Sequence, residues 1–110
     1  MRILRGLAFF FLLLPVSIHA GQILGTIRQD GKALPNIPIQ VTCGPHKYDG
    51  ATDQFGSYSI NIPEKGRCTI VVTLQGKSVG PCDLFSYDDP ARDDFVVERD
   101  TNGNLKLIRR

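Results

Sequence analysis

The chain has 110 residues, of which 42% are hydrophobic and 22% charged, and its formal net charge is +2 at pH 7. A chain of this length provides one small domain, with little room for both a core and a separate lobe that carries a site. The near balance of charge argues against the strongly basic surface of a nucleic-acid-binding protein.

The first twenty residues have the pattern of a secretory signal peptide. Arg2 and Arg5 make a positive start, an uncharged run of 13 residues follows, and Ala20 is the small residue expected before a cleavage point. The run is shorter than the ~20 residues that cross a bilayer as a helix, which argues against a membrane anchor. Cleavage between Ala20 and Gly21 would leave residues 21–110 as an exported chain, periplasmic or secreted, with no membrane span. Its eleven basic residues would balance its eleven acidic ones.

Short runs of alternating apolar residues dominate the rest of the chain, and no helical period of useful length occurs. In chain order, strands are expected at residues 22–28, 37–43, 57–62, 67–74, 78–82, 93–99 and 105–108, with a weak strand within 44–52. Tight turns are expected at Asp30-Gly31, at Gln75-Gly76-Lys77 and in "DTNGN" at 100–104. Seven or eight short strands predict an all-β, antiparallel, two-sheet sandwich as a single domain over residues 21–110.

The segment "TDQFGSYSINI" at 52–62 places an Asp beside two aromatic residues, which raises the question of a binding or catalytic site. A structural turn between strands is the favoured interpretation. Asp53 is expected to bond to the turn backbone through its side chain, and Gly56 is expected to take a positive φ. Tyr58 then belongs to the inward face that continues along the following strand.

Three cysteines in an exported chain favour one disulfide and one remaining thiol. Cys43 ends one inward face and Cys68 begins another, so neighbouring antiparallel strands would bring them together, and this pair is favoured. The alternative pair, Cys68 with Cys82 across a hairpin that turns at Gly76, stays open. No CxxC spacing occurs, and His46 is the only histidine after residue 20, so neither a zinc site nor any other metal site is expected.

The order "GTI…DGKALPNIPIQV…TDQFGSYSINIPEKGRCTIVV" resembles the carboxypeptidase regulatory-like domains, relatives of the transthyretin-like (prealbumin-like) and B-type adhesin repeat sandwiches. The residues that carry this resemblance are Gly25, Gly31 to Leu34, Pro38 to Val41, the Asp53-x-x-Gly56-x-Tyr58 corner and Gly66. The resemblance covers residues 22–97, and the closing arginine pair resembles that of small exported bacterial members. It implies a non-enzymatic accessory module that stands beside catalytic domains, builds surface stalks, or binds partners and sometimes carbohydrates.

No catalytic residue and no cofactor are expected, because His46 has no accompanying nucleophile motif. The candidate binding surface is "LFSYDD", where Phe85 and Tyr87 share one face of an extended segment beside Asp88 and Asp89. Two functions are therefore expected. The first is a structural or protein-interaction role with an unknown protein partner in the periplasm or outside the cell. The alternative is a carbohydrate-binding module that uses the two aromatic residues.

Overall fold

The computed structural model describes residues 21–110, so the predicted signal peptide and Ala20 lie outside the described residues. The strands are β1 (Gln22–Gln29), β2 (Lys32–Ala33), β3 (Pro38–Cys43), β4 (His46–Ala51), β5 (Ser57–Asn61), β6 (Gly66–Leu74), β7 (Lys77–Ser86), β8 (Ala91–Arg92), β9 (Phe95–Arg99) and β10 (Leu105–Arg109). This part of the chain is all-β, and it holds no helix that is long and apolar enough to span a membrane.

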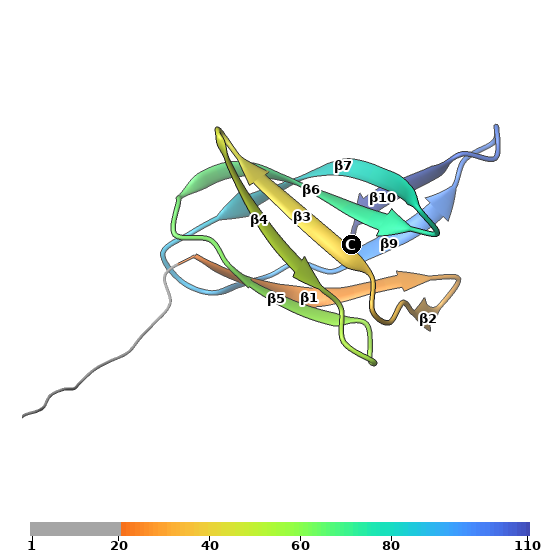
Figure 1. Ribbon diagram of the computed structural model, residues 1–110, viewed down its shortest axis with the longest axis horizontal. Coiled ribbons are helices and arrows are strands. Elements are labelled where there is room, and N and C mark those ends of the chain that lie inside the picture. Colours follow the sequence, from red (N-terminus) through yellow and green to blue (C-terminus); the bar gives the residue numbers. More distant parts are fainter. Residues whose placement is uncertain (1–20) are drawn as a thin grey trace, which may run out of the picture.

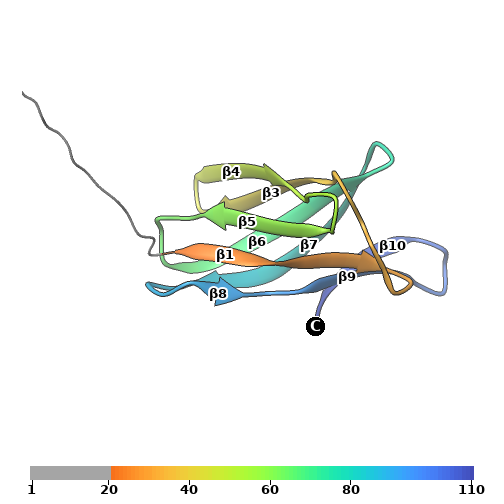
Figure 2. The same ribbon diagram turned by 90° about the horizontal axis from the view of Figure 1, so that it is seen from below.

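The strands form two sheets that lie one above the other (Figures 1 and 2). One sheet has the order β4-β3-β6-β7 and is antiparallel throughout. The other is built around β1, with β5 and β2 along one side of it and β8, β9 and then β10 along the other. The predicted two-sheet sandwich is therefore confirmed.

Two features differ from the expected antiparallel sandwich of seven or eight strands. First, β8 and β9 run parallel to β1, because the chain leaves the end of β7 in one sheet and enters the other alongside β1. Second, β2 and β8 are two residues long, which is too short to leave an alternating pattern in the sequence. The second sheet is consequently mixed, and residues 21–110 form ten strands.

The inward-facing side chains of both sheets form one core. Its buried hydrophobic members are Ile23, Ile27, Ile39, Val41, Cys43, Tyr58, Ile60, Ile62, Cys68, Ile70, Val72, Leu74, Val79, Leu84, Phe95, Val97 and Leu107. Tyr58 and Phe95, which the alternation places inside, are buried with their ring centroids 6.3 Å apart. The strand phases predicted from the sequence are thus those of the folded chain.

A disulfide joins Cys43 on β3 to Cys68 on β6 at one end of this core. The two residues come directly after the last paired residues of the ladder, Thr42 and Thr69, and their Cα atoms are 4.5 Å apart, the spacing of a directly opposed antiparallel pair without ladder hydrogen bonds. The alternative pair is not formed, since Cys68 lies opposite Leu84 while Cys82 lies opposite Ile70 and remains a free, half-buried thiol.

The turns follow the expected chemistry. Asp30 and Gly31 have φ values of 53° and 77°, and Gln75 and Gly76 have 53° and 79°. Positive φ at both central residues is the mark of the two-residue hairpin loop that matches strand twist. Pro38 is the first residue of β3, a position at which its missing N–H removes no interior ladder bond.

The structural turn predicted at Asp53 is present. The Asp53 carboxylate accepts hydrogen bonds from the backbone N–H groups of Phe55 at 2.8 Å and Ser57 at 3.0 Å, and Gly56 has a φ of 75°. Phe55 is left 67% exposed, while Tyr58 turns into the core. The segment is therefore a corner between β4 and β5.

Candidate functional site

The predicted binding surface lies at the far end of the β6–β7 hairpin from its turn. Arg67 on β6 lies directly opposite Phe85 on β7, and both side chains point away from the core because their neighbours Cys68 and Leu84 point into it. Tyr87 follows just beyond the end of β7. We call Arg67, Phe85 and Tyr87 the aromatic–cationic patch.

Stacking holds the three side chains of the patch together. The rings of Phe85 and Tyr87 have centroids 6.4 Å apart and planes inclined by 26°. The Arg67 guanidinium carbon lies 5.8 Å from the Phe85 ring centroid, within the range of a cation–π contact. Phe85 is half-buried, whereas Tyr87 is 56% exposed and forms the most accessible part of the patch.

Charged side chains surround the patch in opposite-sign pairs. Lys65 Nζ lies 3.3 Å from a carboxylate oxygen of Asp88, and Arg67 Nη1 lies 4.0 Å from Asp83. Each exposed pair contributes at most about 1 kcal/mol to stability. These contacts therefore affect the charge around the patch more than they affect the stability of the fold. Asp89 is exposed and makes no ion pair with any residue of 21–110.

Asp94, in the same acidic stretch of the sequence, has a structural role instead. Its Oδ1 accepts hydrogen bonds from the Thr26 backbone N–H at 2.9 Å and from the Thr26 hydroxyl at 3.1 Å, which ties β9 to β1. Arg92 Nε donates to its other oxygen at 3.2 Å. Burial of the carboxyl favours protonation, but the bonds from Thr26 and Arg92 outweigh it and lower the pKa of Asp94.

Asp93 completes this connection between the strands. Its backbone carbonyl accepts a 2.6 Å hydrogen bond from the Tyr58 hydroxyl and occupies the space that a Cβ on Gly25 would need. Burial raises the pKa of the Asp93 carboxyl, and Arg109, 3.8 Å away, only partly opposes that rise. Burial likewise raises the pKa of Tyr58. The two acids therefore hold β9 beside β1 and are not part of an exposed binding surface.

A second polar cluster joins β4 to the loop before β6. His46 Nδ1 lies 2.8 Å from Glu64 Oε2, and the Tyr48 hydroxyl donates to the same oxygen. The hydrogen bond with Tyr48 lowers the pKa of Glu64 and, in return, raises that of Tyr48. No sequence motif signals this cluster, because its members are up to 18 residues apart and are joined only by the fold.

The cluster brings an imidazole nitrogen and a phenol hydroxyl to one carboxylate oxygen. Neither a cysteine nor a serine hydroxyl takes part in the hydrogen bonds that join these three side chains. Within residues 21–110, no group of three or more His, Cys, Asp or Glu side chains is placed to hold a metal ion. Tyr48 is half-buried against the core, whereas the His46 side chain is 63% exposed, so the cluster lies at the surface beside β4.

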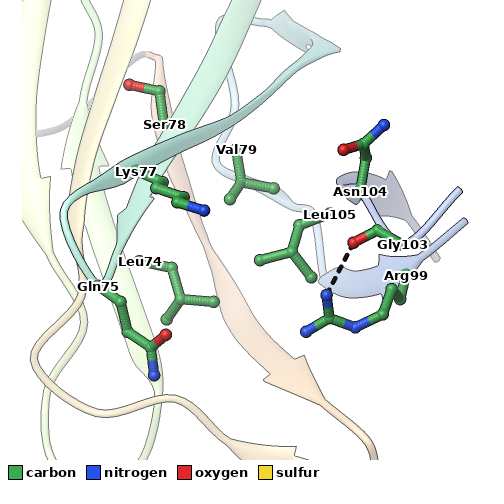
Figure 3. Close-up of a pocket in the computed structure, with 9 residues that line it drawn as sticks. All are labelled: Leu74, Gln75, Lys77, Ser78, Val79, Arg99, Gly103, Asn104 and Leu105. Carbon is green, nitrogen blue, oxygen red and sulfur yellow. Dashed lines mark hydrogen bonds between the residues drawn. The ribbon is translucent and has the colours of Figure 1, made fainter.

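A cleft opens at the opposite end of β7 from the patch. It lies between the β6–β7 turn and the β9–β10 hairpin and has a volume of about 290 Å³ (Figure 3). Leu74, Val79 and Leu105 form its apolar floor, and Lys77 and Arg99 stand on opposite walls. Sequence reasoning missed this cleft because strands from both sheets form it.

Side-chain hydrogen bonds hold the β9–β10 hairpin, which forms one wall of the cleft. The β9–β10 turn, "DTNGN", is a hairpin turn as expected: the Asp100 carboxylate accepts from the backbone N–H groups of Asn102 and Asn104. Arg99 Nη1 donates to the Gly103 carbonyl at 2.8 Å, which fixes the guanidinium at the mouth of the cleft.

Comparison with protein-family models gives no match for this chain, and comparison with curated proteins gives none either.

Proposed function

We propose that the chain is a non-catalytic, exported β-sandwich module of the carboxypeptidase regulatory-like kind that serves a structural or protein-interaction role. The observation that carries the proposal is the aromatic–cationic patch, in which one guanidinium and two aromatic rings stack on an exposed sheet face. Arginine and aromatic side chains, Tyr in particular, are enriched at the centres of protein interfaces. Stacking reduces the side-chain freedom that a partner would otherwise have to remove.

The state of the cysteines supports export. A disulfide between buried cysteines persists in the periplasm or outside the cell, whereas cytosolic thiols are kept reduced. A partner protein would then determine where and for what purpose the module acts.

The alternative is a carbohydrate-binding module that uses Phe85 and Tyr87, and one observation favours it. Tyr87 is a widely exposed ring with carboxylates at the next two positions, and carboxylates accept hydrogen bonds from hydroxyl groups. The geometry fits a protein partner better. One face of Phe85 is occupied by Arg67, its ring stacks on Tyr87, and Asp88 is paired with Lys65.

Site-specific photo-crosslinking in the producing cell tests the interaction role. A benzoylphenylalanine residue at position 87 is expected to give a discrete crosslinked adduct with a protein. The matched control carries the same residue at position 55, because Phe55 is exposed to a similar degree but lies in the β4–β5 corner. Arg67→Ala and Phe85→Ala, introduced into the position-87 protein, are expected to reduce the adduct at least severalfold.

The outcomes separate the two functions. An adduct from position 87 that depends on Arg67, without an equal adduct from position 55, supports the protein-interaction role. Equal, diffuse crosslinking from both positions would contradict it. Binding of the purified protein to a glycan array, lost in Tyr87→Ala and kept in Phe55→Ala, would establish the carbohydrate alternative in its place.

A further inference from the structure

The cleft between the β6–β7 turn and the β9–β10 hairpin combines an apolar floor with a cationic mouth. The floor side chains continue the core: Val79 is fully buried, Leu74 is nearly so, and Leu105 is half-buried. Figure 3 shows Lys77 and Arg99 on opposite walls, with their charged ends directed toward the space above this floor. A molecule in the cleft would therefore meet aliphatic carbon below and positive charge on both sides.

The two cations are not neutralised within the described part of the chain. Neither Lys77 nor Arg99 forms an ion pair with another residue of 21–110, and no Asp or Glu lines the cleft. The acids of the adjacent hairpin are engaged elsewhere. Asp100 accepts from the backbone of its own turn, and Glu98 pairs with Arg110. The mouth of the cleft therefore carries net positive charge.

Arg99 is also held in place for a ligand. Its bond to the Gly103 carbonyl uses one nitrogen of the guanidinium, and the other N–H groups have no partner among the described residues. A guanidinium has five donors in a fixed plane, so the remaining ones match the two oxygens of a carboxylate. Lys77 adds a flexible ammonium from the opposite wall.

We propose that this cleft binds a small monoanion with an aliphatic body, of which a short-chain carboxylate is the simplest example. The aliphatic part lies on the apolar floor, and the carboxylate lies between the two cations. This site is separate from the aromatic–cationic patch and does not depend on the function proposed for that patch.

The volume of the cleft limits the size of the ligand. Pockets for drug-sized ligands range from roughly 300 to 1,000 Å³. At about 290 Å³ the cleft is just below this range, so its ligand is expected to be smaller than a drug-sized molecule. The same chemistry has two sources, a free short-chain carboxylate and the carboxylate of a peptide chain that ends in an aliphatic residue, and the experiment separates them.

NMR titration of the purified, isotope-labelled protein with sodium hexanoate tests the proposal, with the neutral isostere hexanamide as the matched ligand. Hexanoate is expected to cause saturable shifts of the backbone amides of residues 74–79 and 99–105, and hexanamide to bind at least about tenfold more weakly. N-acetyl-leucine and its amide form the second pair of ligands. Tighter binding of N-acetyl-leucine than of hexanoate assigns the site to a peptide carboxylate, and the reverse order assigns it to a free one.

Variants identify the two cations. Lys77→Gln and Arg99→Gln are each expected to weaken hexanoate binding about threefold to tenfold, as expected for loss of one charged contact at a partly exposed site. Arg99→Lys keeps the charge but loses the paired donors and the bond to Gly103, so it is expected to weaken binding less than Arg99→Gln does, which separates loss of charge from loosening of the hairpin. The control is Lys106→Gln, an exposed cation on β10 that faces away from the cleft, with a change below about twofold.

The proposal is overturned if hexanoate and hexanamide bind alike, since the cations then contribute nothing. It is also overturned if the shifts lie outside the two hairpins, or if no saturable shift occurs. An effect of Lys106→Gln equal to that of Lys77→Gln would reduce the interaction to general charge attraction and would likewise reject the site.

Discussion

Asp53 and Asp100 perform the same task in two parts of the chain. In "DQFGS" and "DTNGN" the Asp carboxylate accepts from the backbone N–H groups two and four residues later, at 2.8 and 3.0 Å in both turns. The Gly three residues after the Asp has positive φ in both, 75° and 84°. One five-residue pattern, Asp-x-x-Gly-x, therefore builds both the β4–β5 corner and the β9–β10 hairpin.

Removal of either carboxylate tests this equivalence. Asp53→Ala and Asp100→Ala are each expected to lower the free energy of unfolding by about 1 kcal/mol, because two backbone amides lose a charged acceptor and turn to water. Urea denaturation measures the change. Asp89→Ala, at an exposed acid with no ion pair in residues 21–110, is the control, with an expected change within about 0.5 kcal/mol. Turn variants as stable as the control would show that the carboxylates are dispensable.

Neighbouring Asp93 and Asp94 are expected to give pH effects of opposite sign. The folded state lowers the pKa of Asp94, so its charge stabilises the fold above the unfolded pKa of about 3.9, and this stability is lost as the pH falls through the folded value. The folded state raises the pKa of Asp93, so its charge costs stability at neutral pH, and this cost disappears on acidification.

Two isosteric variants separate these effects. Asp94→Asn is expected to lower the unfolding free energy at pH 7, with a deficit that shrinks toward pH 3. Asp93→Asn is expected to raise it at pH 7, with a gain that shrinks over the same range. Urea denaturation at both pH values measures the two differences, and Asp89→Asn serves as the exposed control. Changes in unfolding free energy of the same sign for both variants at pH 7 would contradict the opposite roles given to the two carboxylates.

At the scale of strands, the alternation in the sequence predicted most of the fold. The inward phases of β3, β5 and β6 follow from period-2 patterns, and the turns at Gly31 and Gly76 follow from residues that adopt positive φ. These features are local, so the sequence displays them directly. The same phases favoured the Cys43–Cys68 pairing over Cys68 with Cys82, and the structure has the favoured pair.

Local sequence patterns could not predict which strands pair with one another or which role each acidic residue has. Nothing within β8 and β9 signals that they run parallel to β1, because that depends on where the chain crosses between sheets. The same crossing places Asp94 on Thr26, 68 residues away, where it ties two strands together. The cleft and the His46–Tyr48–Glu64 cluster were missed for the same reason.

The disulfide between β3 and β6 is expected to stabilise the fold mainly by restricting the conformations of the unfolded chain. Its residues are 25 apart in sequence, so the double substitution Cys43→Ala with Cys68→Ala is expected to cost about 3 kcal/mol of unfolding free energy. Cys82→Ala, at a half-buried free thiol, is the control, with a change within about 1 kcal/mol. Mass analysis after alkylation in denaturant should show one label without reductant and three with it. Three labels without reductant would disprove the pairing.

In the whole molecule, β7 carries both candidate surfaces at its two ends. The cleft adjoins Lys77 at its start, and the patch begins at Phe85 near its end, eight residues further on. At about 3.3 Å per residue these positions are more than 20 Å apart, beyond the range at which variants normally interact. Two surfaces on one strand would allow the module to hold two different molecules at once.

We therefore expect each of the two surfaces to bind independently of the other. Saturating hexanoate should leave crosslinking from position 87 unchanged within about twofold, and Tyr87→Ala should leave the affinity for hexanoate unchanged to the same degree. The double variant Lys77→Gln with Tyr87→Ala should have unfolding free-energy changes that add within about 0.5 kcal/mol. A larger departure would indicate that the core couples the two ends.

The position of the disulfide also determines how the module would respond to a pulling force. The first and last long strands, β1 and β10, belong to the same sheet, while the disulfide lies in the other. A load applied through the two ends would therefore act on the sheet that has no covalent link, and β3 and β6 would stay joined after it opened. The 25-residue loop between the cysteines would remain closed and withhold about 85 Å of extension. Under tension, the module would therefore extend less than its chain length suggests.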